Sequence, residues 1–251
     1  MDRQTDAEVT GGDGQASNRC EFSVIIPALK EAERIDSVVK HVFERQGDAR
    51  CEIIVVDGDP DGETINAVRC HDVVTVVSQM GRARQMNAGA NLAGGEILLF
   101  LHADTRLPPR AFEKARLALA DGRYVAGAFE LGVDTENRLV RATAAKSRLR
   151  ARLTRTPYGD QAIFIRKSYF DKIAGFKDIC FLEDIELMQR IKRRGDKIVI
   201  LPDRVKTSAR RWEKEGILYT TLRNMVVVTL YKFGVSPERL ARYYRNHCDK
   251  A

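Results

Sequence analysis

Short apolar runs alternate with longer amphipathic segments through the first half of the chain. Each run is too short for a globular helix and predicts a buried strand, whereas apolar residues every three or four positions predict helices. This alternation is typical of βαβ units with a parallel sheet, and so of an α/β fold. We expect strands at 22–27, 51–56, 73–77 and 97–101, and helices at 32–43, 63–69 and 81–90.

Polar turns follow three of these strands directly. The strand at 97–101 runs into the turn 102–105, and the first two strands end at Pro27 and Asp57. Parallel strands share a direction, so these turns open on one edge of the sheet, where ligands of open α/β folds bind. A carboxylate such as Asp104 there often holds a divalent cation that in turn holds phosphates. The alternative is that Asp104 only caps the next helix.

The second half of the chain is less regular. A basic amphipathic stretch at 138–155 predicts a helix, and its charges indicate a solvated face more than a specific anion site. We expect further strands at 125–133, after the polar turn at 158–161, and at 199–201, and a helix at 181–190 that begins with two carboxylates.

The segment 216–235 is strongly apolar but is interrupted by Arg223 and Asn224. A membrane-spanning helix needs about 20 mainly apolar residues, and polar side chains are costly inside it. We therefore expect a helix that packs on the domain, on a second copy of the chain or on a membrane surface, rather than a span.

Composition and charge exclude few classes of protein or ligand. The 251 residues are 44% hydrophobic and 31% charged, as in an ordinary soluble protein, and the net charge of +7 suits an anionic ligand without saying which. The five cysteines are scattered without a CxxC pair, and the four histidines form no cluster. This spacing argues against a zinc site or a disulfide framework and favours a reducing, cytoplasmic compartment. The polar N-terminus does not have the pattern of a secretory signal.

Five short motifs then follow one another in order. They are Ser23-Val-Ile-Ile-Pro27 with Glu31, Ile-Ile-Val-Val-Asp57-Gly, Gly81 to Gly89, Leu99-Phe-Leu-His-Ala-Asp104, and Glu183-Asp184 at a helix start. Together they resemble the family-2 glycosyltransferases, which have a GT-A fold and use a nucleotide-diphosphate sugar. The segments LHADTRLP, YGDQAIFIR and SARRW are similar to a bacterial clade described as radical-SAM/selenodomain-associated transferases.

The resemblance covers about residues 20–244 and implies a GT-A, Rossmann-like fold. Its central sheet is expected to be mostly parallel and flanked by helices, with an apolar helical segment at the C-terminus. We divide the chain into a disordered leader at 1–20, a glycosyltransferase domain at 21–212 and a helical extension at 213–251. Within the domain, 21–108 would form the nucleotide-binding half and 109–212 the acceptor half.

Matching the motifs residue by residue implies a set of roles. The resemblance implies that Asp104, with His102 beside it, binds Mg²⁺ or Mn²⁺, and that Asp184, next to Glu183, is the catalytic base of an inverting reaction. The residues expected to contact the nucleotide, the sugar or the acceptor are Pro27, Ala28, Glu31, Asp57, Gly58, Arg82, Asn87, Gly159, Asp160, Gln161, Arg210, Arg211 and Trp212.

Three positions depart from the family pattern. Lys30 stands where the family usually has Asn, His102 replaces the first Asp of the Asp-x-Asp motif, and Gly58 replaces an Asp that contacts the base in many members. Imidazole suits transition metals better than Mg²⁺, so His102 favours Mn²⁺ slightly.

The chemistry explains why these residue types are needed. A nucleoside diphosphate leaves with negative charge, which a cation and nearby arginines stabilise, and the acceptor hydroxyl needs a carboxylate to take its proton. These residues could instead have purely structural roles. In that case Glu183 and Asp184 only complement the helix dipole, Asp160 shapes a turn, and Trp212 packs in the core.

Other functions remain open at this point. The alternatives are an inactive homologue that only binds nucleotide sugars, a sugar nucleotidyltransferase, and a dinucleotide- or methyl-donor-binding domain. The last of these would need a G-x-G-x-x-G motif after a strand, which this sequence does not contain. No nucleic-acid-binding motif supports nucleic acid as a partner. The expected partners are a UDP- or GDP-sugar donor, an unknown acceptor, and either a membrane surface or a second copy contacting 216–235. We expect a cytoplasmic protein, peripheral to the inner face of the membrane if that segment contacts lipid.

Overall fold

The computed structural model describes residues 20–241, except the side chains of Arg211 and Lys214. The leader predicted at 1–20 lies outside the described residues apart from Cys20, as do the last ten residues of the extension. The predicted domain limits remain predictions.

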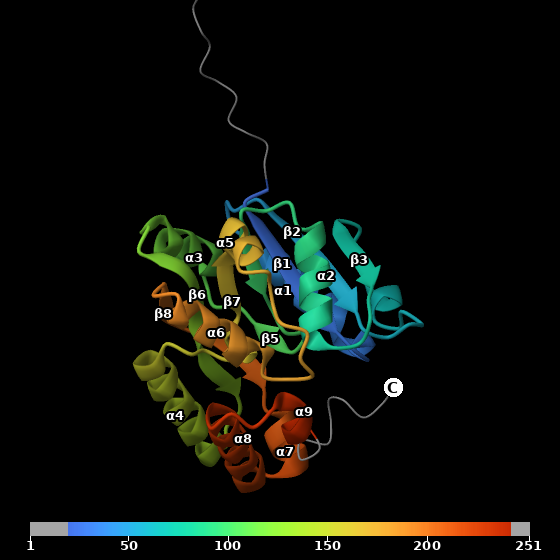
Figure 1. Ribbon diagram of the computed structural model, residues 1–251. Helices are drawn as coiled ribbons and strands as arrows, with labels where there is room; N and C mark the ends of the chain where they lie inside the picture. Colours follow the sequence, from blue (N-terminus) through green and yellow to red (C-terminus); the bar gives the residue numbers. More distant parts are fainter. Residues whose placement is uncertain (1–19, 242–251) are drawn as a thin grey trace, which may run out of the picture.

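An eight-stranded sheet forms the centre of the molecule, in the order β3-β2-β1-β4-β7-β6-β8-β5 (Figure 1). The α/β class expected from the alternating pattern is confirmed. The first four strands are β1 (Phe22–Ala28), β2 (Cys51–Asp57), β3 (Val73–Val77) and β4 (Ile97–Phe100). The later strands are β5 (Thr105–Arg106), β6 (Tyr124–Asp134), β7 (Ile163–Arg166) and β8 (Lys197–Ser208).

The sheet is mixed, which corrects the expectation of a mostly parallel one. β1 pairs in parallel with β2 and β4, β2 with β3, and β6 with β8. β7 pairs antiparallel with both β4 and β6, and β5 pairs antiparallel with β8. The reason is that the chain returns through 158–166 and inserts β7 between β4 and β6 in the opposite direction. Only the β3-β2-β1-β4 half has the parallel order that the apolar runs predicted.

Helices cover both faces of the sheet. One face packs against α1 (Ala32–Arg45) and α3 (Ala111–Ala120). The other packs against α2 (Arg82–Leu92), α5 (Lys167–Lys172) and α6 (Glu183–Arg193). The small residues of α2 allow a close approach, because a Cβ on Gly89 would lie only 2.5 Å from Ile25 Cγ2.

Two further expectations need correction. The helix predicted at 63–69 is only a short 3₁₀ turn, η1 (Ile65–Ala67), because the Asp57 carboxylate accepts hydrogen bonds from the backbone of Thr64 and Ile65 and holds this stretch as a loop. The strand predicted at 199–201 extends over all of β8, which runs beside the similarly long β6. The basic stretch does form a helix, α4 (Arg138–Thr154).

The C-terminal region forms three helices and not one long apolar helix. They are α7 (Arg210–Glu215), α8 (Ile217–Lys232) and α9 (Pro237–Ala241). Figure 1 shows them together below the sheet, with α8 next to α4. A small apolar cluster of Phe181, Val227 and Leu240 ties α8 and α9 to the loop before α6. Among residues 20–241, no helix has both the length and the hydropathy that crossing a bilayer requires.

Candidate active site

A pocket with an empty volume of about 930 Å³ opens beyond β4, between the start of α6, the end of β8 and one side of α8. Seven residues that the sequence predicted line it: Arg82, His102, Asp104, Gly159, Asp160, Asp184 and Trp212. Segments far apart in the chain therefore meet here.

Asp104 is held where β4, β5 and β8 converge. The hydroxyls of Thr105 and Thr207 lie 3.3 and 3.4 Å from its Oδ1, and Ser208 N donates to its backbone oxygen at 3.2 Å. Thr207 belongs to β8, whose pairing with β5 brings it opposite Thr105. The carboxylate is half-buried and lines the pocket.

Asp184 and His102 meet around Gly159, in the 3₁₀ turn η2 (Gly159–Gln161). Gly159 N donates to Asp184 Oδ2 at 2.6 Å, and Ile185 N lies 2.7 Å from Oδ1. A Cβ on Gly159 would lie 2.9 Å from His102 Nε2 and 3.6 Å from Asp184 Oδ2. The absence of a side chain at position 159 therefore allows the imidazole and the carboxylate to approach the same spot.

Glu183 lies behind this carboxylate and does not line the pocket. Its side chain is 2% exposed, its Oε1 lies 3.0 Å from Arg82 Nε, and its Oε2 has no hydrogen-bond partner among the described residues. Burial raises the pKa of Glu183, the Asp184 charge adds to this, and the Arg82 guanidinium opposes it. Arg82 itself lines the pocket, so Glu183 positions Arg82.

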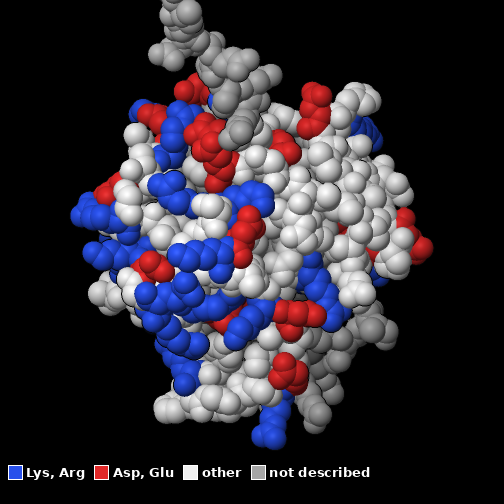
Figure 2. Space-filling model, turned by 45° about the horizontal axis from the view of Figure 1, so that its top comes forward, with Lys and Arg blue, Asp and Glu red and all other residues white. Residues whose placement is uncertain are grey.

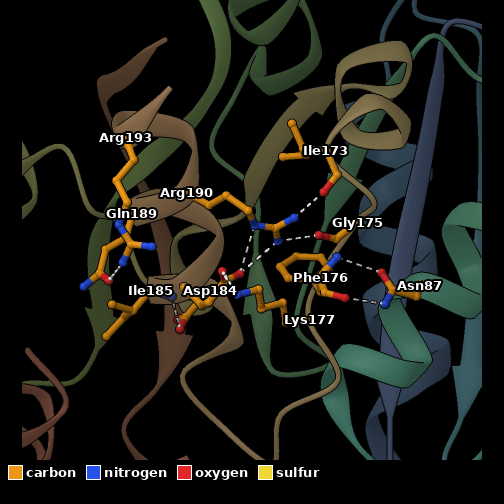
Figure 3. A network of polar contacts seen from close by, with 11 residues as sticks. Asn87, Ile173, Gly175, Phe176, Lys177, Asp184, Ile185, Gln189, Arg190 and Arg193 are labelled. Atoms are coloured by element: carbon orange, nitrogen blue, oxygen red, sulfur yellow. Dashed lines mark hydrogen bonds and ion pairs between the residues drawn. The ribbon is translucent and has the colours of Figure 1, made fainter. Parts of the chain in front are cut away.

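A network of polar contacts fixes the loop before α6 (Figure 3). Asn87 on α2 accepts from Phe176 N at 2.9 Å and donates to Phe176 O at 2.8 Å. From α6, Arg190 donates to the backbone oxygens of Ile173 and Gly175 and pairs with Glu186. Asn87 therefore uses both polar atoms on the protein backbone and does not line the pocket.

The side chain of Gln161 also binds backbone groups. Its Nε2 donates to Phe129 O at 2.8 Å, and its Oε1 accepts from Tyr158 N at 3.1 Å. The side chain is fully buried, whereas its neighbour Asp160 lines the pocket. Gln161 thus anchors the turn that carries Gly159.

The turns after β1 and β2 lie next to each other. Asp57 is fully buried and accepts backbone hydrogen bonds from Asp59, Thr64 and Ile65 within its own loop. Gly58 N donates to Ala28 O, and the Gln85 amide donates to the oxygens of Ala28 and Val56. A Cβ on Gly58 would lie 3.1 Å from this amide, which explains glycine at that position. Pro27, Ala28, Asp57 and Gly58 do not line the pocket, and their nucleotide contacts remain predictions.

Glu31 links the first turn to the C-terminal region. Its Oε1 lies 2.9 Å from Arg210 Nη2 on α7, and its Oε2 lies 3.2 Å from Arg34 Nη1. The ion pair with Arg210 joins residues 179 positions apart. The side chain of Arg211 lies outside the described residues.

Sequence reasoning missed several pocket residues. These are Tyr158, Phe181, Leu182, Ile185, Thr207, Ser208 and, from α8, Thr220, Asn224, Val227 and Val228. Thr220 and Asn224 gave a signal, because polar residues within an apolar helix mark the side that faces a site. The others have ordinary residue types, and only the folded arrangement brings them to the pocket.

The side chains around the pocket that could coordinate a metal ion determine whether one fits there. Within residues 20–241, no group of three or more His, Cys, Asp or Glu side chains is arranged to hold an ion. Mg²⁺ in phosphate sites usually takes one or two carboxylates, with water and phosphate completing its shell. Asp104 with His102 nearby in the same pocket fits a cation that is shared with a diphosphate.

Comparisons with known proteins identify a family and a similar fold. A family model described as Glycosyl transferase family 2 matches residues 23–177. The mannosyltransferase PcManGT from Pyrobaculum calidifontis, solved in complex with GDP-Man and Mn²⁺, is similar with a TM-score of 0.63 and 22% identity, over 88% of this chain and 67% of that one. At this identity the structural likeness concerns the fold. No protein with a curated description matches the chain.

Proposed function

The chain belongs to glycosyl transferase family 2 and is a glycosyltransferase, and from this premise we propose that it transfers a sugar from a nucleotide-diphosphate sugar to an acceptor hydroxyl with inversion. The observation that supports this most is the shared pocket, in which Asp104, His102 and Arg82 face the same space as Asp184. A group that binds anions and a group that accepts a proton are both needed for such a transfer.

The leaving diphosphate would be stabilised on the Asp104 side of the pocket. Arg82, oriented by the buried Glu183, supplies a positive charge close to it. Asp104 and His102 would hold Mg²⁺ or Mn²⁺, which supplies Lewis-acid stabilisation of the developing negative charge. Arg210 lies near the first turn through its pair with Glu31 and is suited to a second contact with the diphosphate.

Asp184 would take the proton of the attacking hydroxyl. The hydrogen bond from Gly159 N holds its carboxylate at the pocket wall, so the oxygen is preoriented before an acceptor arrives. Attack from this side on the anomeric carbon, opposite the diphosphate, gives inversion. Asp160 and Trp212 line the same space and are the residues we assign to contacts with the sugar or the acceptor.

The donor, the clade and the cellular location are proposed from the sequence motifs, the cysteine pattern and one similar structure. We propose a UDP- or GDP-sugar donor, because the motifs resemble enzymes that use such donors and because PcManGT was solved with GDP-Man. On the segments LHADTRLP, YGDQAIFIR and SARRW we place the chain in the radical-SAM/selenodomain-associated clade. The scattered cysteines favour a cytoplasmic location.

The test is Asp184→Asn with Asp72→Asn as its matched control, since Asp72 is exposed and lies outside the pocket. Nucleoside diphosphates and their sugars are first screened by thermal shift with and without Mn²⁺, because a ligand of the folded state raises Tm. We expect Asp184→Asn to keep the ligand-induced rise in Tm and to lose donor turnover by a factor of about 100 or more, the range for a general base. A variant that retains the rate of the Asp72→Asn control removes Asp184 from this role.

A further inference from the structure

Helix α8 exposes an unusually apolar side to solvent. Its inner side lines the pocket with Thr220, Asn224, Val227 and Val228. Its outer side presents large apolar residues, of which Leu218 is 82% exposed and Leu222 58%, and Phe233, directly after the helix, is 83% exposed. These recur at helical spacing along one side, so they form a continuous stripe. A stripe of this size facing water usually marks an interaction site.

The neighbouring helix also exposes large apolar residues. α4 contacts α8, and its exposed residues include Leu149 and Leu153. Figure 1 shows the two helices side by side at the bottom of the molecule. We call the outer sides of α4 and α8 together the α4–α8 face.

Charge on the α4–α8 face has one sign. Neither helix contains an acidic residue, and their exposed basic residues include Arg138, Arg141 and Lys146 on α4 and Lys232 on α8. Three other basic residues have acidic partners: Arg148 and Arg152 lie against Glu130, and Arg223 pairs with Glu215. Figure 2 shows Lys and Arg gathered on the left of the molecule. Apolar residues flanked by basic ones are the pattern of surfaces that lie on anionic membranes.

We infer that the α4–α8 face docks on the surface of an anionic lipid bilayer. A symmetric dimer through the same face is disfavoured, because two-fold symmetry would set the exposed basic residues of α4 and α8 in one copy against those of the other. An anionic bilayer complements both features, since its interface takes up the apolar side chains and its headgroups attract the basic ones. Docking would also bring α8, one wall of the pocket, to the membrane surface. The inference does not rest on the proposed function, because binding is measured without any donor.

The test is co-sedimentation of the full chain with vesicles of phosphatidylcholine alone or mixed with phosphatidylglycerol. We expect binding only to the mixed vesicles and weaker binding at high salt, because salt screens the attraction. The double variant Leu222→Ser/Phe233→Ser should bind about tenfold more weakly or worse, since burying one large apolar side chain is worth about that much. Lys146→Gln, which removes one exposed charge, should weaken binding about fivefold.

The matched control is Leu92→Ser/Leu117→Ser, which removes two exposed leucines from α2 and α3. It should bind as the unaltered protein does. All the replaced side chains are exposed, so Tm should stay unchanged and loss of binding will not reflect unfolding. The inference is overturned if the unaltered protein ignores both kinds of vesicle or if both double variants bind equally well. It is also overturned if sedimentation velocity shows self-association that Leu222→Ser/Phe233→Ser abolishes.

Discussion

Replacing Gly159 by alanine is the most direct test of the site geometry. The backbone of Gly159 lies outside the left-handed region, so alanine is free to adopt it. The new Cβ, however, would lie 2.9 Å from His102 Nε2, where ordinary contact begins at 3.4 Å, so the imidazole must move by about 0.5 Å. A displacement of 1 Å at a reacting centre costs up to about 100-fold in rate, so about tenfold is expected here, or about 1.4 kcal/mol of transition-state stabilisation.

The assay is release of nucleoside diphosphate from the donor with Mn²⁺, alongside the thermal-shift titration. Gly122→Ala is the matched control, because no other atom lies within 4 Å of the place its new methyl group would take and its backbone is also outside the left-handed region. The tenfold loss should appear only in Gly159→Ala, with Tm nearly unchanged. In a His102→Ala background the same substitution should cost little, because the clash is gone. Full activity of Gly159→Ala would refute the view that His102 and Asp184 act around this glycine.

Three further predictions follow from individual contacts. Burial raises the pKa of Glu183, with Arg82 opposing it, so the folded state binds this proton more tightly than the unfolded state and loses stability as pH rises. The Tm of Glu183→Gln relative to the unaltered protein should therefore rise as the pH increases from about 4.5 towards neutral, and a difference independent of pH would contradict this. Asn87→Ala should lower stability by about 1–3 kcal/mol through its lost bonds to Phe176 while leaving the donor KM unchanged; a raised KM at constant Tm would instead make Asn87 a substrate contact. Asp104→Asn should lose the part of the ligand-induced rise in Tm that depends on Mn²⁺, and a persistent Mn²⁺ effect would exclude Asp104 as a metal ligand.

The sequence predicted the fold well where a short apolar run was enough to specify a buried strand. The buried runs at 22–27, 51–56 and 97–101 became adjacent parallel strands because strands covered on both faces are apolar throughout. The polar turn after the third of them put Asp104 and His102 in the pocket, as its position at a carboxyl strand end predicted.

Residues that serve the backbone were harder to recognise. Asn87, Gln161 and Asp57 matched motif positions expected to contact substrate, and these contacts remain predictions. In the fold their side chains bind Phe176, the turn at 158–161 and the loop at 59–65. An amide or carboxylate has the same appearance in a sequence whether it binds a ligand or a peptide group. Its partner is decided by which segment packs next to it.

The sequence by itself determined the α/β class, the parallel half of the sheet and the stretches from which the pocket is built, because these depend on local periodicity and on motifs read along the chain. Only the tertiary structure decided the rest. The reversal of β7 made the sheet mixed, and the contact of Gly159 with His102 and Asp184 formed one wall of the pocket. The packing of α8 turned one side of that helix to the pocket and left large apolar residues exposed on the other. Each of these depends on contacts between residues far apart in the chain, which no local pattern specifies.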